Sequence, residues 1–152
     1  MKWSHSLIDY QNYLRIERGL SKNSVENYCL DIKKLIRYLE LHQIEVSPIK
    51  ISSQTLQDFI YQTAKTINPR SQARLISGLK SFFNYLIFED YRPDNPMELI
   101  ESPKTGRKLP DTLAIEEIDQ IIATLDLSTP EGERNRTMLE TLYSCGLRVS
   151  EL

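Results

Sequence analysis

Residues 142–152 read Leu-Tyr-Ser-Cys-Gly-Leu-Arg-Val-Ser-Glu-Leu, in which an apolar helical run ends at a glycine and an arginine-bearing segment follows. Glycine adopts the left-handed conformation that ends many helices, so Gly146 predicts a helix end. An arginine held beside such a tight turn can aim a planar fork of donors at a phosphate, whereas a lysine offers only a point charge. Arg148 is therefore the first candidate functional residue.

The residues before Gly146 have the period of amphipathic helices. One helix is expected to begin at Thr129-Pro130, and a shorter helix is expected before it. The side chains predicted to face inward from these two helices are Ile118, Ile121, Ile122, Leu125, Met138, Leu139, Leu142 and Tyr143. Residues 111–152 thus read as the start of a helical domain.

A proline-rich connector precedes this domain. Prolines at positions 93, 96, 103 and 110, with Gly106 among them, forbid a long helix and predict an extended segment. We place a domain boundary there, with a first domain at 1–90, a linker at 91–110 and a second domain at 111–152. Lys104, Arg107 and Lys108 make this linker basic, so it is a candidate DNA contact as well as an ordinary solvated linker.

Residues 1–90 predict four helices, and no segment alternates long enough to require a strand. The expected helices are 6–18, 22–41 after Ser21, one from Ser52 or Ser53, and 69–88 with Asn68 as its N-cap. The apolar stripes of these helices are formed by Leu7, Tyr10, Leu14, Val25, Tyr28, Ile32, Leu35, Ile36, Leu39, Leu56, Phe59, Ile60, Leu75, Leu79, Phe82, Phe83 and Leu86. The fold class is all-α.

Charge is divided unevenly along the chain, whose 152 residues carry a net charge of −2. Residues 1–110 hold 16 Lys+Arg and 12 Asp+Glu, while residues 111–152 hold 3 and 9. A modestly basic first domain suits phosphate binding if its charge lies on one face, although ordinary charge fluctuation would give similar counts.

Cysteine spacing and hydropathy exclude other classes. Cys29 and Cys145 lack the spacing of a disulfide framework or a zinc site, so reduced thiols are expected. No secretion signal or membrane span is visible, and we predict a cytoplasmic protein.

Two clusters in the first domain suit nucleic-acid phosphates. Ser21, Lys22, Asn23 and Ser24 place hydroxyl, ammonium and amide donors around a predicted helix N-terminus, where the helix dipole favours anions. A plain serine N-cap with solvated neighbours is the alternative.

The second cluster lies on the predicted helix 69–88. Arg70, Arg74, Ser77 and Ser81 recur at three-four spacing with Lys80 adjacent, and we expect them opposite the apolar stripe. A solvated outer face would look similar. The helix contains no Asp or Glu, however, which favours phosphate neutralisation.

Three quoted segments together carry a family resemblance. Residues 17–28 (ERGLSKNSVENY), 103–110 (PKTGRKLP) and 132–152, which end in GLRVSEL, resemble Xer-type tyrosine site-specific recombinases of the phage-integrase family. The resemblance implies a four-helix, SAM-like core-binding domain followed by the first helices of the catalytic domain. It also implies that Arg148 binds the scissile phosphate and that Glu151 helps to hold that arrangement.

The resemblance further implies a reaction and partners. The reaction is DNA strand cleavage and rejoining through a 3′-phosphotyrosine, without metal or cofactor, in chromosome dimer resolution, chromosome partition and cell division. The implied partners are double-stranded DNA, a homo- or hetero-oligomer with a second recombinase, and a septal DNA translocase, with no membrane. Because the other catalytic groups would follow Leu152, we expect these 152 residues to bind DNA without cleaving it.

Alternatives remain open at this point. The parent could be the integrase of a mobile element, the chain could be a non-catalytic DNA-binding module, or it could be a helical interaction domain that binds no DNA. Neither His5 nor His42 lies in the domain that would catalyse. Tyr143 is expected in the core of its helix pair and not as a nucleophile.

Overall fold

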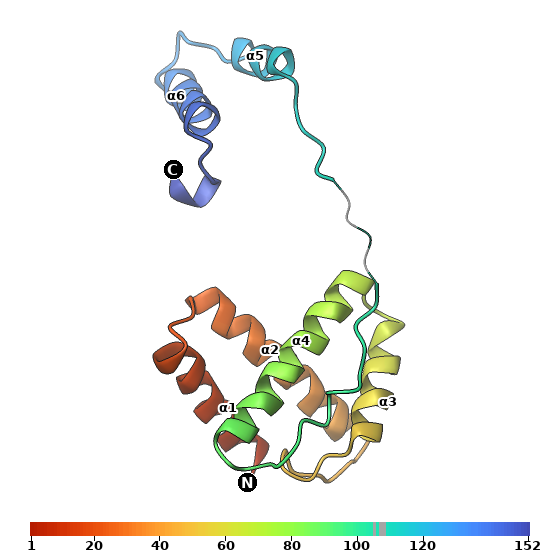
Figure 1. The fold of residues 1–152 in the computed structure, drawn as a ribbon. Coiled ribbons are helices and arrows are strands. Elements are labelled where there is room, and N and C mark those ends of the chain that lie inside the picture. The colour runs from red at the N-terminus through yellow and green to blue at the C-terminus, as the bar shows by residue number, and fades with distance from the viewer. Residues whose placement is uncertain (105, 107–108) are drawn as a thin grey trace. The chain divides into compact units, whose positions relative to one another are not determined.

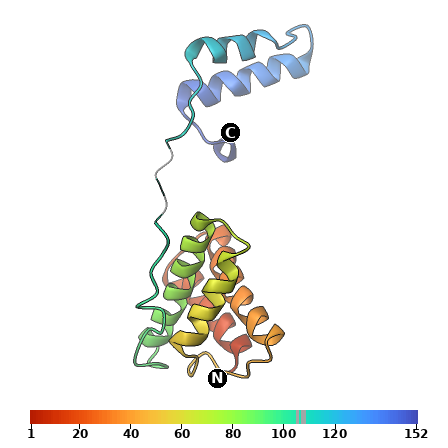
Figure 2. The same ribbon diagram turned by 90° about the vertical axis from the view of Figure 1, so that its right-hand side faces the viewer.

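The computed structural model describes residues 1–104, 106 and 109–152, and it divides into two compact units, Met1–Gly106 and Arg107–Leu152 (Figures 1 and 2). Within the described ranges the regular secondary structure is entirely helical, which confirms the all-α prediction. In chain order the elements are α1 (Trp3–Asn12), η1 (Tyr13–Glu17), α2 (Lys22–Leu41), α3 (Ser53–Ala64), α4 (Pro69–Phe88), α5 (Ile115–Ala123), α6 (Pro130–Cys145) and η2 (Val149–Glu151).

Side-chain caps start the longer helices of the first unit where the sequence predicts. The Ser21 and Ser52 hydroxyls and the Asn68 amide oxygen each accept a hydrogen bond from a backbone N–H in the first turn of the helix that follows. Pro69 takes the first position of α4, where its missing N–H costs nothing. These caps fix the residues at which α2, α3 and α4 begin.

The core of the first unit is built around α4, which contacts both α2 and α3 (Figure 1). Leu75, Leu79 and Phe82 of its apolar stripe are fully buried. The Phe82 ring is stacked near Trp3 of α1, with the ring centroids 6.1 Å apart, and meets Tyr10 edge-on at 5.2 Å. The predicted apolar stripes of all four helices therefore meet in one cluster.

The first helix differs from its prediction. It begins at Trp3 and leaves the α-helical pattern after Asn12, where the π-helical turn η1 begins. The Arg18 amide donates to the Tyr13 carbonyl five residues earlier at 3.0 Å. Periodicity at three-four spacing does not reveal such a widened turn, because Tyr10 and Leu14 still face the core.

The segment after Asp90, predicted as the start of the linker, packs against the first unit over much of its length. Met97 is fully buried and Ile100 is 7% exposed, and both belong to the hydrophobic core. Asn95 donates to the Lys80 carbonyl at 3.2 Å, and its own side-chain oxygen accepts from the Met97 amide at 2.9 Å. The compact first unit runs to Gly106, inside the predicted linker.

Arg92 anchors this segment. Its side chain is almost fully buried, and Nη1 donates to the carbonyl oxygens of Pro48 at 3.0 Å and Ile51 at 3.1 Å. The guanidinium lies 5.5 Å from the ring centroid of Phe83. Arg92 thus joins the residues after α4 to the α2–α3 connection and the core.

We expect Arg92→Ala to lower the free energy of unfolding by about 2 to 3 kcal/mol, because it removes charge-assisted hydrogen bonds from a buried site. Urea unfolding followed by the fluorescence of the single tryptophan, Trp3, measures the change. The control is Arg37→Ala on the exposed side of α2, with an expected effect below about 0.5 kcal/mol. Equal midpoints for the two variants would contradict the anchoring role.

The second unit is a helix pair. Thr129 caps α6, accepting from the Gly132 amide at 3.1 Å, and Gly146 ends the helix with φ +62°, as predicted. The two helices contact each other, yet Ile121, Met138 and Tyr143 stay exposed to 45%, 41% and 51%. Tyr143 therefore does not occupy the core position expected for it, because the described part of this unit leaves that face of α6 uncovered. Neither unit contains a described helix that could span a membrane.

Candidate nucleic-acid interface

The start of α2 carries the first predicted cluster. The Ser21 hydroxyl accepts from the Ser24 amide at 3.3 Å and lies 3.0 Å from the Ser24 hydroxyl. The Lys22 side chain is 90% exposed, with its ammonium 4.0 Å from the Glu26 carboxylate. Asn23 is exposed, and no acidic residue occupies the first turn. The N-cap and the solvated donors thus occur together, and this helix end favours an anion.

The start of α4 carries the second cluster. The Asn68 side chain accepts from the Ser71 amide at 2.8 Å, and Arg70 is exposed in the first turn, which also lacks acidic residues. Arg74 and Ser77 follow on the exposed surface of the next turns. Both helices of this unit therefore begin with a positive dipole end, and Lys22 and Arg70 are exposed in their first turns.

Arg74 forms an ion pair that the sequence pattern of α4 does not show. Its Nη1 and Nη2 atoms donate to the two carboxylate oxygens of Asp31, on α2, at 2.9 and 2.8 Å. The Asp31 side chain is 1% exposed, whereas the Arg74 side chain is 46% exposed. Burial raises the pKa of Asp31, against the opposing influence of Arg74 and of Lys34 at 3.7 Å. Arg74 thus bridges the two helices and still reaches solvent.

A pocket of about 240 Å³ lies at this bridge, and we call it the α2–α4 cleft. It is lined by Ser24, Asn27, Tyr28, Asp31, Arg74, Ser77 and Gly78. The cleft brings Ser24 from the first predicted cluster together with Arg74 and Ser77 from the second. Asn27, Asp31 and Gly78 were not predicted as site residues, and Tyr28 was assigned to the apolar stripe of its helix. An acidic residue beside the apolar stripe of α2 is the signal that could have identified Asp31.

Other predicted residues lie outside the cleft. The Lys80 ammonium donates to the Glu98 carbonyl at 3.3 Å, on the segment that follows α4. Ser81, expected opposite the apolar stripe, instead accepts from the buried Tyr10 hydroxyl at 2.9 Å and so faces the core. Lys104 is exposed, and the predicted contacts Arg107 and Lys108 lie outside the described residues.

Arg148 is held by its own turn. Gly146 adopts the left-handed conformation, and Glu151 accepts from the Arg148 backbone amide at 2.8 Å and from Nη1 of the same residue at 3.1 Å. The Arg148 side chain remains 82% exposed. The Arg148 guanidinium is thus oriented by Glu151, three residues later, and it remains accessible to a ligand.

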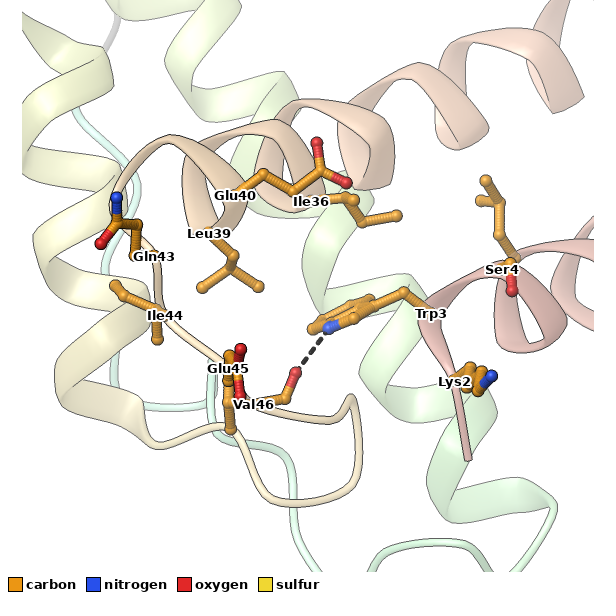
Figure 3. Close-up of a pocket in the computed structure, with 11 residues that line it drawn as sticks. Lys2, Trp3, Ser4, Ile36, Leu39, Glu40, Gln43, Ile44, Glu45 and Val46 are labelled. Carbon is orange, nitrogen blue, oxygen red and sulfur yellow. Dashed lines mark hydrogen bonds between the residues drawn. The ribbon is translucent and has the colours of Figure 1, made fainter.

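Another hollow of the first unit, about 760 Å³, is not near the proposed DNA contacts (Figure 3). It lies between the start of α1 and the end of α2, and its walls include Trp3, Leu39 and Val46. The Trp3 indole N–H donates to the Val46 carbonyl at 2.7 Å. None of the residues predicted to contact DNA lines this hollow.

The sequence of this chain is similar to that of known proteins. A family model described as "Phage integrase, N-terminal SAM-like domain" matches residues 7–90. Proteins named tyrosine recombinase XerD from Listeria innocua and Staphylococcus haemolyticus are 34% and 39% identical to this chain over 145 residues. Each comparison covers 95% of this chain and 49% of the relative, so the chain spans about half the length of these curated relatives.

A solved structure shares the fold. The integrase from mycobacterium phage Brujita aligns with a TM-score of 0.61 at 19% sequence identity. The alignment covers 95% of this chain and 46% of the phage protein. At this identity the likeness shows a common helical architecture.

Proposed function

We propose that this chain binds double-stranded DNA, because it belongs to the phage integrase, N-terminal SAM-like domain family. The observation that carries the proposal is the α2–α4 cleft, where Arg74 and Ser77 of α4 lie beside Ser24 of α2. The first turns of both helices lack acidic residues, and the Arg74 guanidinium reaches solvent between them. Cationic and hydroxyl donors around such a cleft suit the phosphates of a duplex.

The proposed contacts follow from exposure. Lys22 and Arg70 are exposed and would approach phosphates from the first turns of α2 and α4, and Arg74 would approach from the cleft. Lys80 lies further along α4 and would contact a phosphate beside the segment that follows this helix. Ser21, Asn23, Ser24 and Ser77 would add neutral hydrogen bonds. The linker cations Lys104, Arg107 and Lys108 are proposed as further DNA contacts, of which Arg107 and Lys108 lie outside the described residues.

We extend the proposal to the reaction of the whole protein. The relatives are named tyrosine recombinases, so we propose site-specific strand cleavage and rejoining, in the resolution of chromosome dimers, with a second recombinase and a septal translocase as partners. Arg148 would bind the scissile phosphate through its exposed fork while Glu151 fixes its backbone. Bidentate donors at such a phosphate stabilise the charge of phosphoryl transfer.

The test is the salt dependence of duplex binding. We expect the dissociation constant of a short fluorescein-labelled duplex, measured by fluorescence anisotropy, to rise steeply with salt, because phosphate contacts release counterions. Lys50→Ala, at an exposed site in the α2–α3 connection, is the matched control and should leave the binding curve unchanged. Absence of binding at low salt, or affinity independent of salt, would contradict the proposal.

A further inference from the structure

We propose that Asp31 is a positioning residue that holds the Arg74 guanidinium in the orientation that contacts DNA, and that Gly78 exists to make room for it. This inference rests on the proposed DNA-binding function. It assigns a role to an acidic residue in a surface that would otherwise be expected to exclude acids. Asp31 itself is buried and does not reach the nucleic acid.

The geometry of the pair supports positioning. Two hydrogen bonds of 2.9 and 2.8 Å hold the end of the guanidinium against the carboxylate, so the plane of the fork is fixed relative to both helices. A guanidinium has more N–H donors than one carboxylate can take, and Arg74 is 46% exposed. The remaining donors are therefore free for a phosphate, and little side-chain freedom is left to lose on binding.

Gly78 explains why this pair can form. It lies inside α4, where alanine is more favourable for the helix than glycine. A Cβ atom added at Gly78 would lie 2.5 Å from Oδ2 of Asp31 and 3.2 Å from its Cγ. Only a residue without a side chain lets the carboxylate approach the α4 backbone this closely. The Asp31–Arg74 pair therefore depends on Gly78 of α4 as well as on Asp31 of α2.

Stability alone does not account for the pair. Removing a carboxylate from water is costly, and buried ion pairs often add nothing relative to neutral residues of similar size. Burial raises the pKa of Asp31, so the fold favours the protonated acid more than the unfolded chain does. The role that best explains a charged Asp31 carboxylate at this site is the orientation of the Arg74 guanidinium. Asparagine is similar in shape and keeps one acceptor oxygen, and Arg74 is 46% exposed, so Asp31→Asn leaves no buried unpaired charge and should be tolerated by the fold.

Asp31→Asn gives a test in which positioning and simple electrostatics predict opposite signs. The substitution removes a negative charge from the proposed DNA surface, so electrostatics alone predicts tighter duplex binding. Positioning predicts binding about tenfold weaker and a salt slope reduced by about one unit, as if Arg74 were lost. The matched control is Glu26→Gln, which removes an exposed acid from the same helix and should leave binding unchanged or tighter.

Two further variants separate positioning from general damage. Arg74→Ala should weaken binding by a similar factor. Asp31→Asn added to it should cause no further loss, because Arg74 is the proposed phosphate contact that Asp31 positions, and Lys34, 3.7 Å from the same carboxylate, is not one. Gly78→Ala leaves every charge in place and displaces the carboxylate, so it should reproduce the loss seen with Asp31→Asn. Thermal melts by circular dichroism establish that each variant is folded. If Asp31→Asn does not fold, duplex binding by Gly78→Ala tests the positioning role.

These experiments distinguish failure of the positioning role from failure of the proposed DNA binding. Binding by Asp31→Asn as tight as wild type, independent losses in the double variant, or wild-type binding by Gly78→Ala would each overturn the positioning role. Unchanged binding by Arg74→Ala would overturn it too. In these cases salt-dependent binding by the wild-type chain would leave the proposed function standing. Failure of the wild-type chain to bind the duplex would remove the proposed function and this inference together.

Discussion

Replacing Lys22, Arg70, Arg74 and Lys80 together with alanine is expected to flatten the plot of log K against log salt by roughly 3 to 4 units. Each of these cations is proposed to neutralise one phosphate, and each contact releases nearly one condensed counterion when DNA binds. Three of the four are exposed, and Lys80 is partly so. Anisotropy titrations of a labelled duplex at several salt concentrations give the slope.

A control with the same change in net charge tests whether the effect is local. Alanine at Lys2, Lys50, Lys65 and Arg136 removes four exposed cations that lie outside the α2–α4 cleft. This variant should keep most of the wild-type slope, because it removes no proposed phosphate contact. Equal flattening in both variants would mean that charge as a whole, and not this surface, governs binding.

Phe82→Ala is expected to lower the free energy of unfolding of the first unit by about 3 to 5 kcal/mol. The ring is fully buried and lies within aromatic contact distance of Trp3, Tyr10, Phe83 and Tyr85, so its removal leaves a cavity that these rings cannot readily fill. Urea unfolding measured by circular dichroism gives the change. Trp3 fluorescence should also report it directly, because the indole stacks on the lost ring.

Phe88→Ala is the matched control for that substitution. Phe88 is the last residue of the same helix and is 65% exposed, with one aromatic neighbour, Tyr13, at 5.8 Å. We expect a change below about 1 kcal/mol, because most of the ring is already in water. Similar losses for the two phenylalanines would contradict a core centred on α4.

Local chemistry made much of this molecule predictable from its sequence. Asn68 and Pro69 set the start of α4, and Gly146 set the end of α6, because each needs only its nearest neighbours to act. The Xer-type resemblance, carried by three short motifs, is confirmed by the family match and by the relatives named tyrosine recombinase XerD. The roles assigned to Arg148 and to the cations of α2 and α4 stay predictions.

Contacts between distant residues could not be predicted in the same way. Arg74 and Asp31 are 43 positions apart in the sequence. The lack of acidic residues within α4 suggested that its cations are unpaired, but Arg74 is paired with Asp31 of α2. Prolines 93 and 96 indicated a connector, yet Met97 and Ile100 complete the core, because proline forbids a helix without forbidding burial. Tyr143 has the spacing of a core residue, and its exposure depends on what packs on α6.

The packing of Arg92, Met97 and Ile100 has a consequence for dissecting this protein. Sequence similarity delimits the domain at residues 7–90, but residues beyond both of these limits pack in the core of the first unit. A fragment cut at those limits would lose Trp3, whose indole stacks on Phe82. It would also lose Arg92, which contacts Phe83 and the α2–α3 connection, and the core residues Met97 and Ile100. A self-sufficient fragment should therefore include everything from Met1 to Ile100.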